Sequence, residues 1–338
     1  MSAASTTAGR QGSSLFGSAR RLLATQEGIL LILLVALFVG VGLYNDGFFA
    51  WNNVTDLFSV NAYIAVAAIG MSMIIITGNI DISVGSAIGV LVTLSGYVAL
   101  GLADAGLPLP LVNLGAWVVP MFGGMLIGAI NGFFVAYLHI PAIVVTLGMF
   151  SILKGGLILV AGGVTLYDLP AGYSFAMDDL LGVPQPVWIM VILTIVAFLW
   201  MRYSRTGRAQ YAVGGNAEAA RLSGLDTRRI LMTTFILGGL FTGIASVMYA
   251  TQFHTIQAVA TPGLELQVIT ASVVGGVSIL GGVGTVIGST LAAILIRFIG
   301  SALVFVDISP FWVKAILGVL ILATVLADVV RRRRQERQ

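Results

Sequence analysis

The sequence predicts an all-α membrane protein with about ten transmembrane helices, some of them interrupted near a transport pathway. Three observations support this class. Of 338 residues, 58% are apolar and only 9% are charged, whereas soluble domains carry about 25% charged residues. The mean hydropathy is +1.02, so the bilayer must be the main solvent of this chain. Long apolar segments also recur along its whole length.

A helix needs about 20 apolar residues to cross a bilayer, and ten segments approach or exceed this length. They run over residues 28–44, 57–77, 84–103, 112–137, 141–161, 187–203, 230–250, 264–280, 283–306 and 311–330. The 42 glycines fit this interpretation, because small residues let membrane helices pack closely. We therefore expect a single transmembrane domain over residues 28–330.

Residues 1–27 are expected to form a disordered tail, because Ser, Gly, Ala and Thr dominate their first part. The basic residues before the first apolar segment also resemble the start of a secretory signal peptide. No small-residue cleavage site follows Tyr44, and further apolar segments continue the pattern. We therefore expect an uncleaved first span.

The basic residues predict the orientation, because Lys and Arg collect on the cytoplasmic side. Fourteen of the seventeen lie in the N-terminal tail, in or beside the connection between the sixth and seventh segments, or in residues 331–338. An even number of spans places these three regions on one side. We expect a multi-pass protein with both termini, including a basic tail at 331–338, in the cytoplasm.

Two apolar regions are interrupted by polar and glycine-rich sequence, at residues 78–83 and 275–282. Overlaying Gly85 on Gly284 aligns several flanking apolar residues and indicates a weak internal repeat. Interrupted helices in corresponding halves point to a transport pathway. The alternative is that similar glycine-rich turns arose by chance.

Asp81 is the most informative acidic residue, because it lies among apolar residues between two long apolar segments. A carboxylate at bilayer depth needs polar partners or water. Asn79 and Ser83 lie two residues away on either side, so we expect all three to line the translocation pathway. The alternative is that Asp81 or Ser83 caps the helix that begins near Val84.

Three further polar residues lie inside predicted spans: Asn131, Lys154 and Arg297. Lys154 and Arg297 fall toward the outer half, where they would meet polar solute groups, pair with acidic residues or extend to the interface. Asn131 lies in a ladder of glycines. It is a candidate for the pathway, although a hydrogen bond between helices is the favoured interpretation.

The cytoplasmic connection at residues 204–229 contains a short helix of about two turns. Asn216 is a suitable N-cap, and Gly224 is a suitable terminator. Such a helix is marginal alone, so we expect its alanine face to dock into a protein groove; lying on anionic lipid is the alternative. The residues assigned to this surface are Gly214, Gly215, Asn216, Glu218, Ala219, Ala220, Arg221 and Gly224.

The sequence also excludes several chemistries. It has no cysteine, its two histidines lie far apart, and no Gly-x-x-x-x-Gly-Lys-Ser/Thr phosphate loop occurs. We therefore expect no cofactor in this chain and no enzymatic activity of its own. Any ATP hydrolysis must come from another chain.

Residues 79–86 (NIDISVGS) resemble a signature of the ribose-type ABC importer permeases. Residues 140–148 (IPAIVVTLG), 214–225 (GGNAEAARLSGL) and 275–288 (GGVSILGGVGTVIG) resemble the same family, in the same order. The resemblance covers about residues 57–328. It implies a bacterial inner-membrane pore of two permease subunits, identical or paralogous, that transports monosaccharides or related solutes. It also implies ATPase subunits that bind ATP and Mg²⁺, and a periplasmic solute-binding protein.

By the same resemblance, residues 214–224 form the coupling helix that inserts into the ATPase. Asn79 and residues 308–312 resemble members that move autoinducer-2, rhamnose or similar solutes. Many members have asparagine after the position of Arg297, but this chain has Phe298-Ile299-Gly300, so no sugar contact is assigned there. No nucleic-acid partner is expected.

The main alternative is an ion-coupled secondary carrier, which needs acidic residues at mid-membrane. Asp81 is the candidate for that role, while Glu265 lies near the end of its segment. A membrane-embedded enzyme would need a catalytic pair, and none is visible in the sequence.

Overall fold

The computed structural model describes residues 25–170, 172–173, 178–253, 255–257 and 263–335. Most of the expected N-terminal tail (1–24) and the last three residues lie outside the described part. The helices that enter the apolar region are α2 (Gln26–Tyr44), α3 (Trp51–Ser59), α4 (Ala62–Ile76), α5 (Val84–Asp104), α6 (Leu109–Ala136), α7 (Ala142–Ala161), α8 (Gln185–Tyr203), α11 (Thr227–Ala250), α12 (Leu264–Val274), α13 (Val286–Phe305) and α14 (Trp312–Gln335). A 3₁₀ turn, η1 (Asp46–Phe49), follows α2, and two short helices, α9 (Arg205–Gly215) and α10 (Ala217–Leu222), connect α8 to α11.

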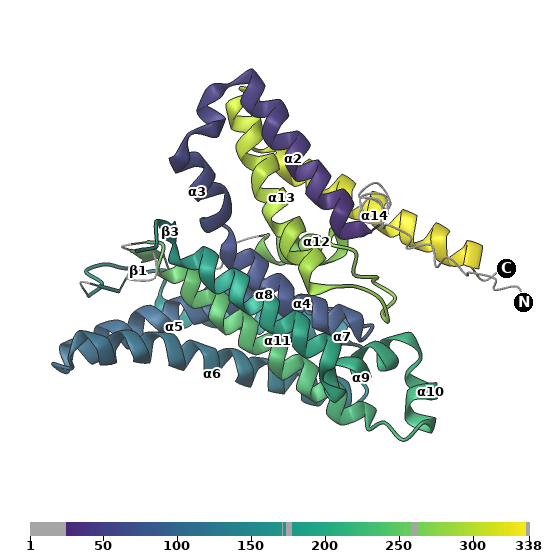
Figure 1. Ribbon diagram of the computed structural model, residues 1–338. Helices are drawn as coiled ribbons and strands as arrows, with labels where there is room; N and C mark the ends of the chain where they lie inside the picture. Colours follow the sequence, from purple (N-terminus) through teal and green to yellow (C-terminus); the bar gives the residue numbers. More distant parts are fainter. Residues whose placement is uncertain (1–24, 171, 174–177, 254, 258–262, 336–338) are drawn as a thin grey trace, which may run out of the picture.

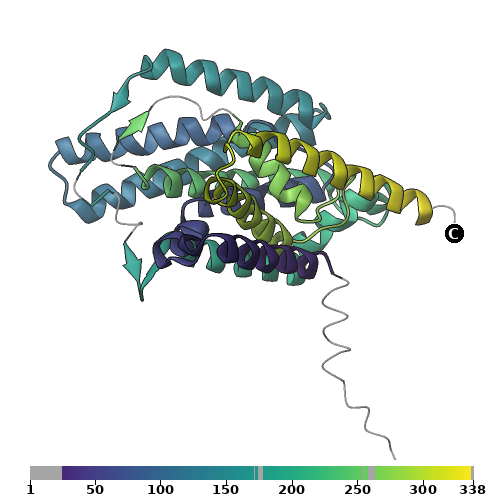
Figure 2. The same cartoon turned by 90° about the horizontal axis from the view of Figure 1, so that it is seen from above.

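The helices form two groups that meet at α4 (Figure 1). In one group α11 packs on α6 and α4, and α5 packs on α6; in the other, α13 packs on α2, α12 and α4. Figure 2 shows α14 (yellow) extending beyond the other helices toward the C-terminus. Because α14 is largely uncovered by the rest of the chain, an apolar environment such as lipid or another subunit must cover it.

The all-α membrane class is confirmed, with nine helices in the described part long and apolar enough to span. The span expected at 264–280 differs, because α12 ends at Val274 and has only 11 residues. The following glycines explain this: Gly276, Gly281 and Gly282 adopt positive φ angles of 96°, 83° and 77°, which residues with a Cβ rarely adopt. This segment is therefore a half-length helix and not a full span.

Two other expected boundaries also move. The second span is divided into α3 and α4 by a break at Val60 and Asn61. At the ends, α2 begins at Gln26, inside the expected tail, and α14 continues to Gln335, so the first part of the expected basic tail is helical.

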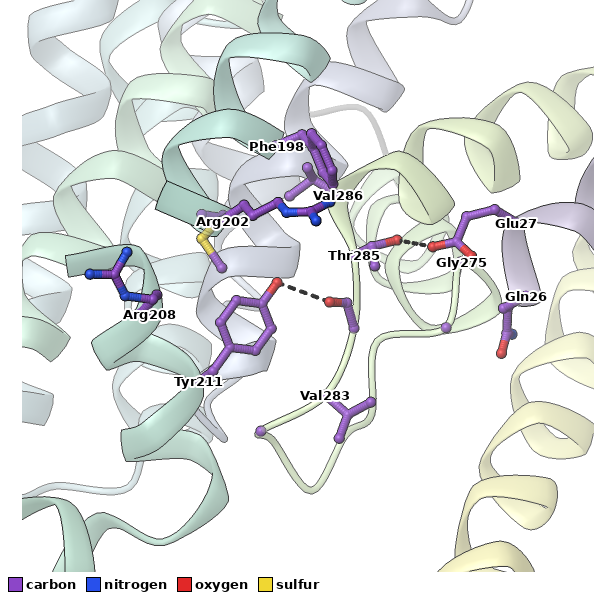
Figure 3. A pocket seen from close by; sticks show the side chains of 14 residues that line it. Gln26, Glu27, Phe198, Arg202, Arg208, Tyr211, Gly275, Val283, Thr285 and Val286 are labelled. Atoms are coloured by element: carbon purple, nitrogen blue, oxygen red, sulfur yellow. Dashed lines mark hydrogen bonds between the residues drawn. The ribbon is translucent and has the colours of Figure 1, made fainter. Parts of the chain in front are cut away.

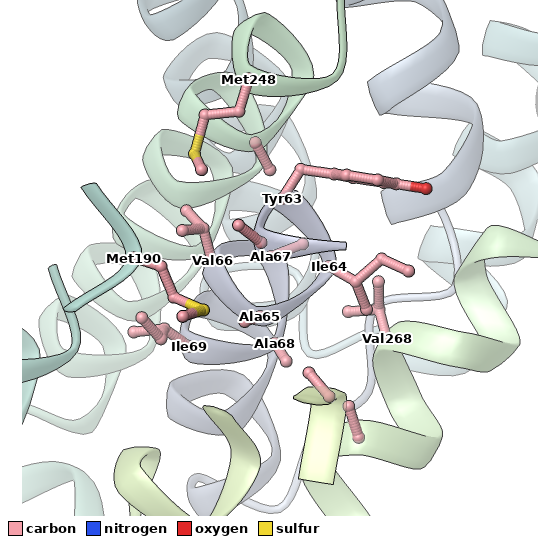
Figure 4. Close-up of a cluster of buried hydrophobic side chains, with 14 of the residues drawn as sticks. Tyr63, Ile64, Ala65, Val66, Ala67, Ala68, Ile69, Met190, Met248 and Val268 are labelled. Carbon is pink, nitrogen blue, oxygen red and sulfur yellow. The ribbon is translucent and has the colours of Figure 1, made fainter. Parts of the chain in front are cut away.

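Helix α4 is the centre of the molecule, and all of its 15 residues are buried. Its sequence is apolar all round, as expected for a helix enclosed by other helices. Figure 4 shows Ile64, Val66 and Ile69 of α4 surrounded by side chains of neighbouring helices, including Met190 and Val268. The polar exceptions are bonded within the core; Ser72 donates to the Ala68 carbonyl oxygen at 2.6 Å.

Glycines hold α6 and α11 close together. A Cβ atom on Gly124 or Gly128 would overlap with backbone oxygens of α11, and a Cβ atom on Gly239 would overlap with the backbone of α6. Small residues at such contacts let two membrane helices approach through their backbones. The glycine ladder noticed in the sequence is therefore the α6–α11 interface.

The connections gather at two ends of the molecule. The loops 77–83 and 275–285, the α6–α7 turn and the helices α9 and α10 lie at one end, which we call the α10 end. At the other, the β1 end, β1 (Thr165–Leu166) pairs with β4 (Ile256–Gln257) and β2 (Asp179–Leu180) pairs with β3 (Val183–Pro184), both antiparallel. The connections therefore alternate between the two ends along the chain, and which end faces the cytoplasm stays a prediction.

Candidate translocation pathway and coupling surface

The structure brings Asn131 of α6 next to Asp81 and Ser83, which lie in the loop between α4 and α5. The Ser83 backbone N–H and hydroxyl both donate to Asp81 Oδ1, at 2.8 and 2.5 Å. Asn131 of α6 donates to the Ser83 hydroxyl at 3.0 Å and to Asp81 Oδ2 at 3.5 Å. Asp81 is only 8% exposed, so these hydrogen bonds replace the water that its carboxylate would otherwise need.

Neighbouring residues close this loop further. Thr146 of α7 accepts a hydrogen bond from the Ile82 N–H at 3.1 Å, and Asn79 donates to Thr77 at 3.1–3.2 Å. Ser83 is the N-cap residue of α5, but its side chain makes no capping bond. In this geometry Asp81, Asn79 and Ser83 fix the course of the chain between α4 and α5. Their contact with a solute stays a prediction.

The structure does not bring Lys154 to this cluster. Its ammonium lies 5.4 Å from the centroid of the Phe150 ring on the same helix, and α7 is mostly exposed. The two ion pairs found in the described part of the chain, Glu218–Arg221 and Asp226–Arg229, lie in the connection between α8 and α11. The structure therefore gives Lys154 no acidic partner there, and its role in the pathway stays a prediction.

Arg297 lies near the middle of α13, away from the Asp81 cluster. Its charge is within electrostatic range of Asp56 on α3 and Tyr63 on α4. Its Nε atom is buried and has no hydrogen-bond partner among the described residues. A buried donor of this kind is rare in native proteins and requires an explanation.

The short helix expected in the connection is present as α10. Asn216 caps it, with its Oδ1 accepting from the Ala219 N–H at 2.9 Å, and Gly224 follows it with a positive φ of 85°. Helix α9, which precedes it, was not expected. It begins at Arg205 with Ser204 as its cap, because the Ser204 hydroxyl accepts from the Gly207 N–H at 2.8 Å.

The faces of α10 differ from the expectation. Ala220 is only 5% exposed and packs inside the chain against Val213 and Ile230, so it cannot fill a groove on a partner. Ala219 and Leu222 are exposed, and the Leu222 side chain is 74% exposed. Glycine and alanine content alone could not show which alanine faces inward, because that depends on how α9 and α11 pack on α10.

A junction of four glycines joins α9 to both interrupted loops; we call Gly78, Gly214, Gly281 and Gly282 the glycine junction. The Gly282 N–H donates to the Ile76 carbonyl oxygen at 2.8 Å. A Cβ atom on Gly214 would overlap with that same oxygen, and one on Gly281 would lie 2.8 Å from the Gly214 oxygen. Three separate backbone segments therefore meet without intervening side chains.

A cavity of about 560 Å³ borders the loop 275–285 at the α10 end (Figure 3). On one side of the loop, Tyr211 of α9 donates to the Gly284 carbonyl oxygen at 3.0 Å. On the other, Thr285 donates to Glu27 at 2.6 Å, and Gln26 donates to the Val274 carbonyl oxygen at 3.2 Å. The loop is thus held between α9 and the first residues of α2.

Sequence reasoning missed Glu265, which is on the first turn of α12. A Cβ atom on Gly85 of α5 would overlap with its Oε2 atom, so the carboxylate packs directly on the α5 backbone. Its Oε2 is buried and has no hydrogen-bond partner among the described residues. Because the sequence predicted a full span from residue 264, Glu265 was expected at a membrane surface, whereas the half-length α12 places it inside.

Comparison with known proteins identifies the family. The model of the permease component of branched-chain amino acid transport systems matches residues 53–325. The chain belongs to this permease family. It is 35% identical over 305 residues to the autoinducer 2 import system permease protein LsrC of Yersinia enterocolitica, covering 90% of this chain and 82% of the relative. The LsrC proteins of Yersinia pseudotuberculosis and Salmonella typhi are each 34% identical, covering 90% of this chain and 84% and 85% of the relatives. No solved structure matches the chain significantly.

The family match includes most of the described helices. It begins within α3 and ends within α14, so it includes the Asp81 loop, α10 and the glycine junction. Helix α2, which contacts the loop 275–285, precedes the matched region. The chain is therefore a permease of an import system.

Proposed function

We propose that this permease is the transmembrane subunit of an ATP-driven importer for a small, uncharged, hydroxyl-rich solute of the autoinducer-2 or monosaccharide class. The partners are an ATPase that binds ATP and Mg²⁺, a second permease subunit and a periplasmic solute-binding protein. The observation that carries the proposal is α10. It is a capped helix outside the apolar region that the glycine junction connects to both interrupted loops.

Coupling by α10 follows from its exposed surface. Leu222 is 74% exposed although it lies outside the apolar spans, and a large apolar side chain in this position favours contact with a partner protein. Glu218 and Arg221 form an ion pair of 2.6 Å beside it. A force on α10 would reach Gly214 through α9 and then the loops on either side of the pathway.

The class of solute is supported by the relatives, which are named as autoinducer 2 import permeases, and by the low charge of the spans. Away from the helix ends, the described apolar spans carry no cluster of basic side chains, so an anionic solute would find little compensation. A neutral solute with several hydroxyl groups needs hydrogen-bonding side chains and not counter-charges.

The orientation follows from the basic residues around α9, α10 and the end of α14. We place the α10 end in the cytoplasm, the β1 end in the periplasm and the whole chain in a bacterial inner membrane. Since the chain has no cysteine, single cysteines report the topology directly. Ser223→Cys should react with a membrane-impermeant maleimide only after the cells are opened, and Leu181→Cys should react in intact cells. The same labelling pattern at both positions would contradict the topology.

The decisive test of the function is Leu222→Asp with Leu222→Met as its control. Burying a leucine contributes about 1.5–3 kcal/mol, and a tenfold change in affinity corresponds to about 1.4 kcal/mol. We expect the aspartate variant to lose its co-purifying ATPase and ATP-dependent uptake of autoinducer-2, D-ribose or L-rhamnose in proteoliposomes. The methionine variant keeps the apolar volume and should retain both.

The ion-coupled secondary carrier is the second candidate, favoured by the embedded carboxylate of Glu265. The same preparations separate the two functions. Uptake that needs a proton or sodium gradient, needs no ATP and is unchanged in Leu222→Asp would establish the carrier and exclude the coupling role of α10.

A further inference from the structure

A second cavity, of about 230 Å³, lies at the β1 end between α5 and the segment that follows α11. Its lining includes Gly89 and Val92 of α5, Tyr249 and Phe253 at the end of α11, and Gln257 of β4. Sites for drug-sized ligands have volumes of about 300–1,000 Å³. A cavity slightly below this range suits a solute about the size of a single sugar ring.

Glu265 does not line this cavity but lies beyond one end of it, along the same face of α5. Gly85, Gly89 and Val92 are spaced i, i+4 and i+7, so they lie on one face of α5. The Glu265 carboxylate packs on Gly85. It is therefore on the face that floors the cavity, about one helical turn, or 5.4 Å, further toward the α10 end. Its buried Oε2 has no hydrogen-bond partner among the described residues.

A second buried polar group without a partner among the described residues, Arg297, lies near the Tyr249 side of the cavity. The rings of Tyr249 and Tyr63 lie 4.7 Å apart, centroid to centroid. Figure 4 shows the Tyr63 hydroxyl pointing away from the aliphatic side chains of α4. Arg297, whose buried Nε lacks a partner among the described residues, is within electrostatic range of Tyr63. The Arg297 cation and the Tyr63–Tyr249 ring pair thus lie behind the residues that line this side of the cavity.

The depth of Glu265 in the membrane follows from the register of α12 against α4. Ser272 of α12 donates to the Ala68 carbonyl oxygen of α4 at 3.2 Å, and the two helices run in the same direction. Counting back equally along both, Glu265 comes level with Asn61, where the chain breaks between α3 and α4. Interrupted helices at mid-depth are the usual sites of solute binding in transporters.

We propose that this cavity is the solute-binding site of the permease, with the Glu265 carboxylate accepting hydrogen bonds from solute hydroxyl groups. This inference rests on the proposed function and adds to it the place and chemistry of recognition. The rings of Tyr249 and Phe253 cover the apolar face of the solute, and the Gln257 amide supplies a donor and an acceptor. Glu265 repels anions from the inner end, so the site selects neutral solutes.

The first test compares uptake by Glu265→Gln and Glu265→Ala in the assembled transporter. The amide keeps one acceptor oxygen but loses the charge, and we expect about a tenfold lower rate of uptake, with a larger loss for alanine. The matched control is Asp307→Asn. Asp307 is an exposed acid near the β1 end whose φ of 56° is a conformation that asparagine also adopts, so uptake should be unchanged.

The second test reports binding without any change at Glu265. Because the chain has no cysteine, Gln257→Cys provides a single thiol in the cavity, and Leu181→Cys provides one on an exposed turn of the same end. Autoinducer-2 or D-ribose at millimolar concentration should slow maleimide labelling at position 257 at least threefold and leave labelling at 181 unchanged.

The outcomes separate the two claims. Normal wild-type uptake together with unchanged uptake in Glu265→Gln and no protection at position 257 overturns this site and leaves the importer intact. If Glu265→Gln does not insert, the protection experiment alone decides. A wild-type assembly that transports none of the three solutes with ATP overturns the proposed function and this inference with it.

Discussion

The loop 77–83 at the α10 end and the cavity at the β1 end both bring polar groups into apolar surroundings, but the carboxylates of Asp81 and Glu265 differ in their hydrogen bonding. Around Asp81, the carboxylate, the Ser83 hydroxyl and the Asn131 amide nitrogen bond to one another, while Asn131 Oδ1 is buried without a partner among the described residues. Beyond the lining of the cavity, Glu265 Oε2 and Arg297 Nε are buried without partners among the described residues.

This difference assigns roles. A polar group that is fully bonded inside the protein fixes the fold, whereas leaving one unpaired costs about 1–3 kcal/mol. An unpaired buried group therefore requires an explanation, and a ligand that later supplies the partner is one such explanation. We therefore interpret the Asp81 carboxylate as part of a structural connection next to the glycine junction, and the Glu265 carboxylate as the group that the solute pairs with in the proposed site.

Gly214→Ala should have the largest effect, because its Cβ would overlap with the backbone oxygen of Ile76, which cannot rotate away. Overpacking of this kind costs about 3 kcal/mol. We expect a clear fall in the midpoint of thermal unfolding and loss of ATPase coupling. Gly215→Ala is the matched control, since a Cβ there meets nothing within 4 Å. Equal unfolding midpoints for the two variants would contradict the junction.

Asp81→Ala should come next. It removes the acceptor of the Ser83 N–H and hydroxyl and leaves buried donors unpaired, at about 1–3 kcal/mol. We expect lower thermal stability and a lower amount of protein in the membrane, with uptake reduced in the same proportion. Uptake that falls while stability and amount stay normal would instead place Asp81 in the pathway.

Arg297→Met should affect thermal stability in the opposite way to Asp81→Ala. Replacing a buried, incompletely paired charge with an apolar side chain of similar length is often neutral or stabilising. We therefore expect an unchanged or higher unfolding midpoint together with slower solute uptake. A fall in stability of the size seen for Asp81→Ala would show that Arg297 is structural.

The smallest expected effect is that of pH on ATPase binding at the α10 surface. The Arg221 guanidinium hydrogen-bonds Glu218 and holds the pKa of that carboxyl below its ordinary value. A lowered pKa in the folded state gives stability that is present above the unfolded pKa of about 4.3 and is lost as pH falls through the folded pKa. Since the pair is exposed and screened, ATPase binding should not change between pH 8 and pH 6. A marked loss within that range would require another titrating group.

Sequence patterns predicted most of the fold because apolar length and basic residues report directly on the bilayer. They also located α10, since Asn216 and Gly224 have local effects that need no tertiary information. The length of α12 could not be predicted. Residues 264–280 are mostly apolar, but α12 ends at Val274, just before Gly276 with its positive φ of 96°.

The same dependence on tertiary packing limited the prediction of the candidate site. Asp81, Ser83 and Asn131 were singled out because polar residues in apolar segments are conspicuous, and they do meet. Glu265 was set aside because its depth depends on where α12 ends, and Gly85 gives no sign in the sequence of the carboxylate that it contacts. Which alanine of α10 faces outward also depends on packing against Val213 and Ile230.

The most direct test of this account measures thermal stability and solute uptake in the same preparations of Asp81→Asn and Glu265→Gln. The account predicts that Asp81→Asn lowers the unfolding midpoint while uptake per folded transporter stays within about twofold of wild type. It predicts that Glu265→Gln keeps the midpoint and lowers uptake about tenfold, the loss expected when a charged hydrogen bond of about 1.4 kcal/mol is removed. The reverse pattern, with Asp81→Asn stable but inactive and Glu265→Gln unstable but active per folded molecule, would contradict it.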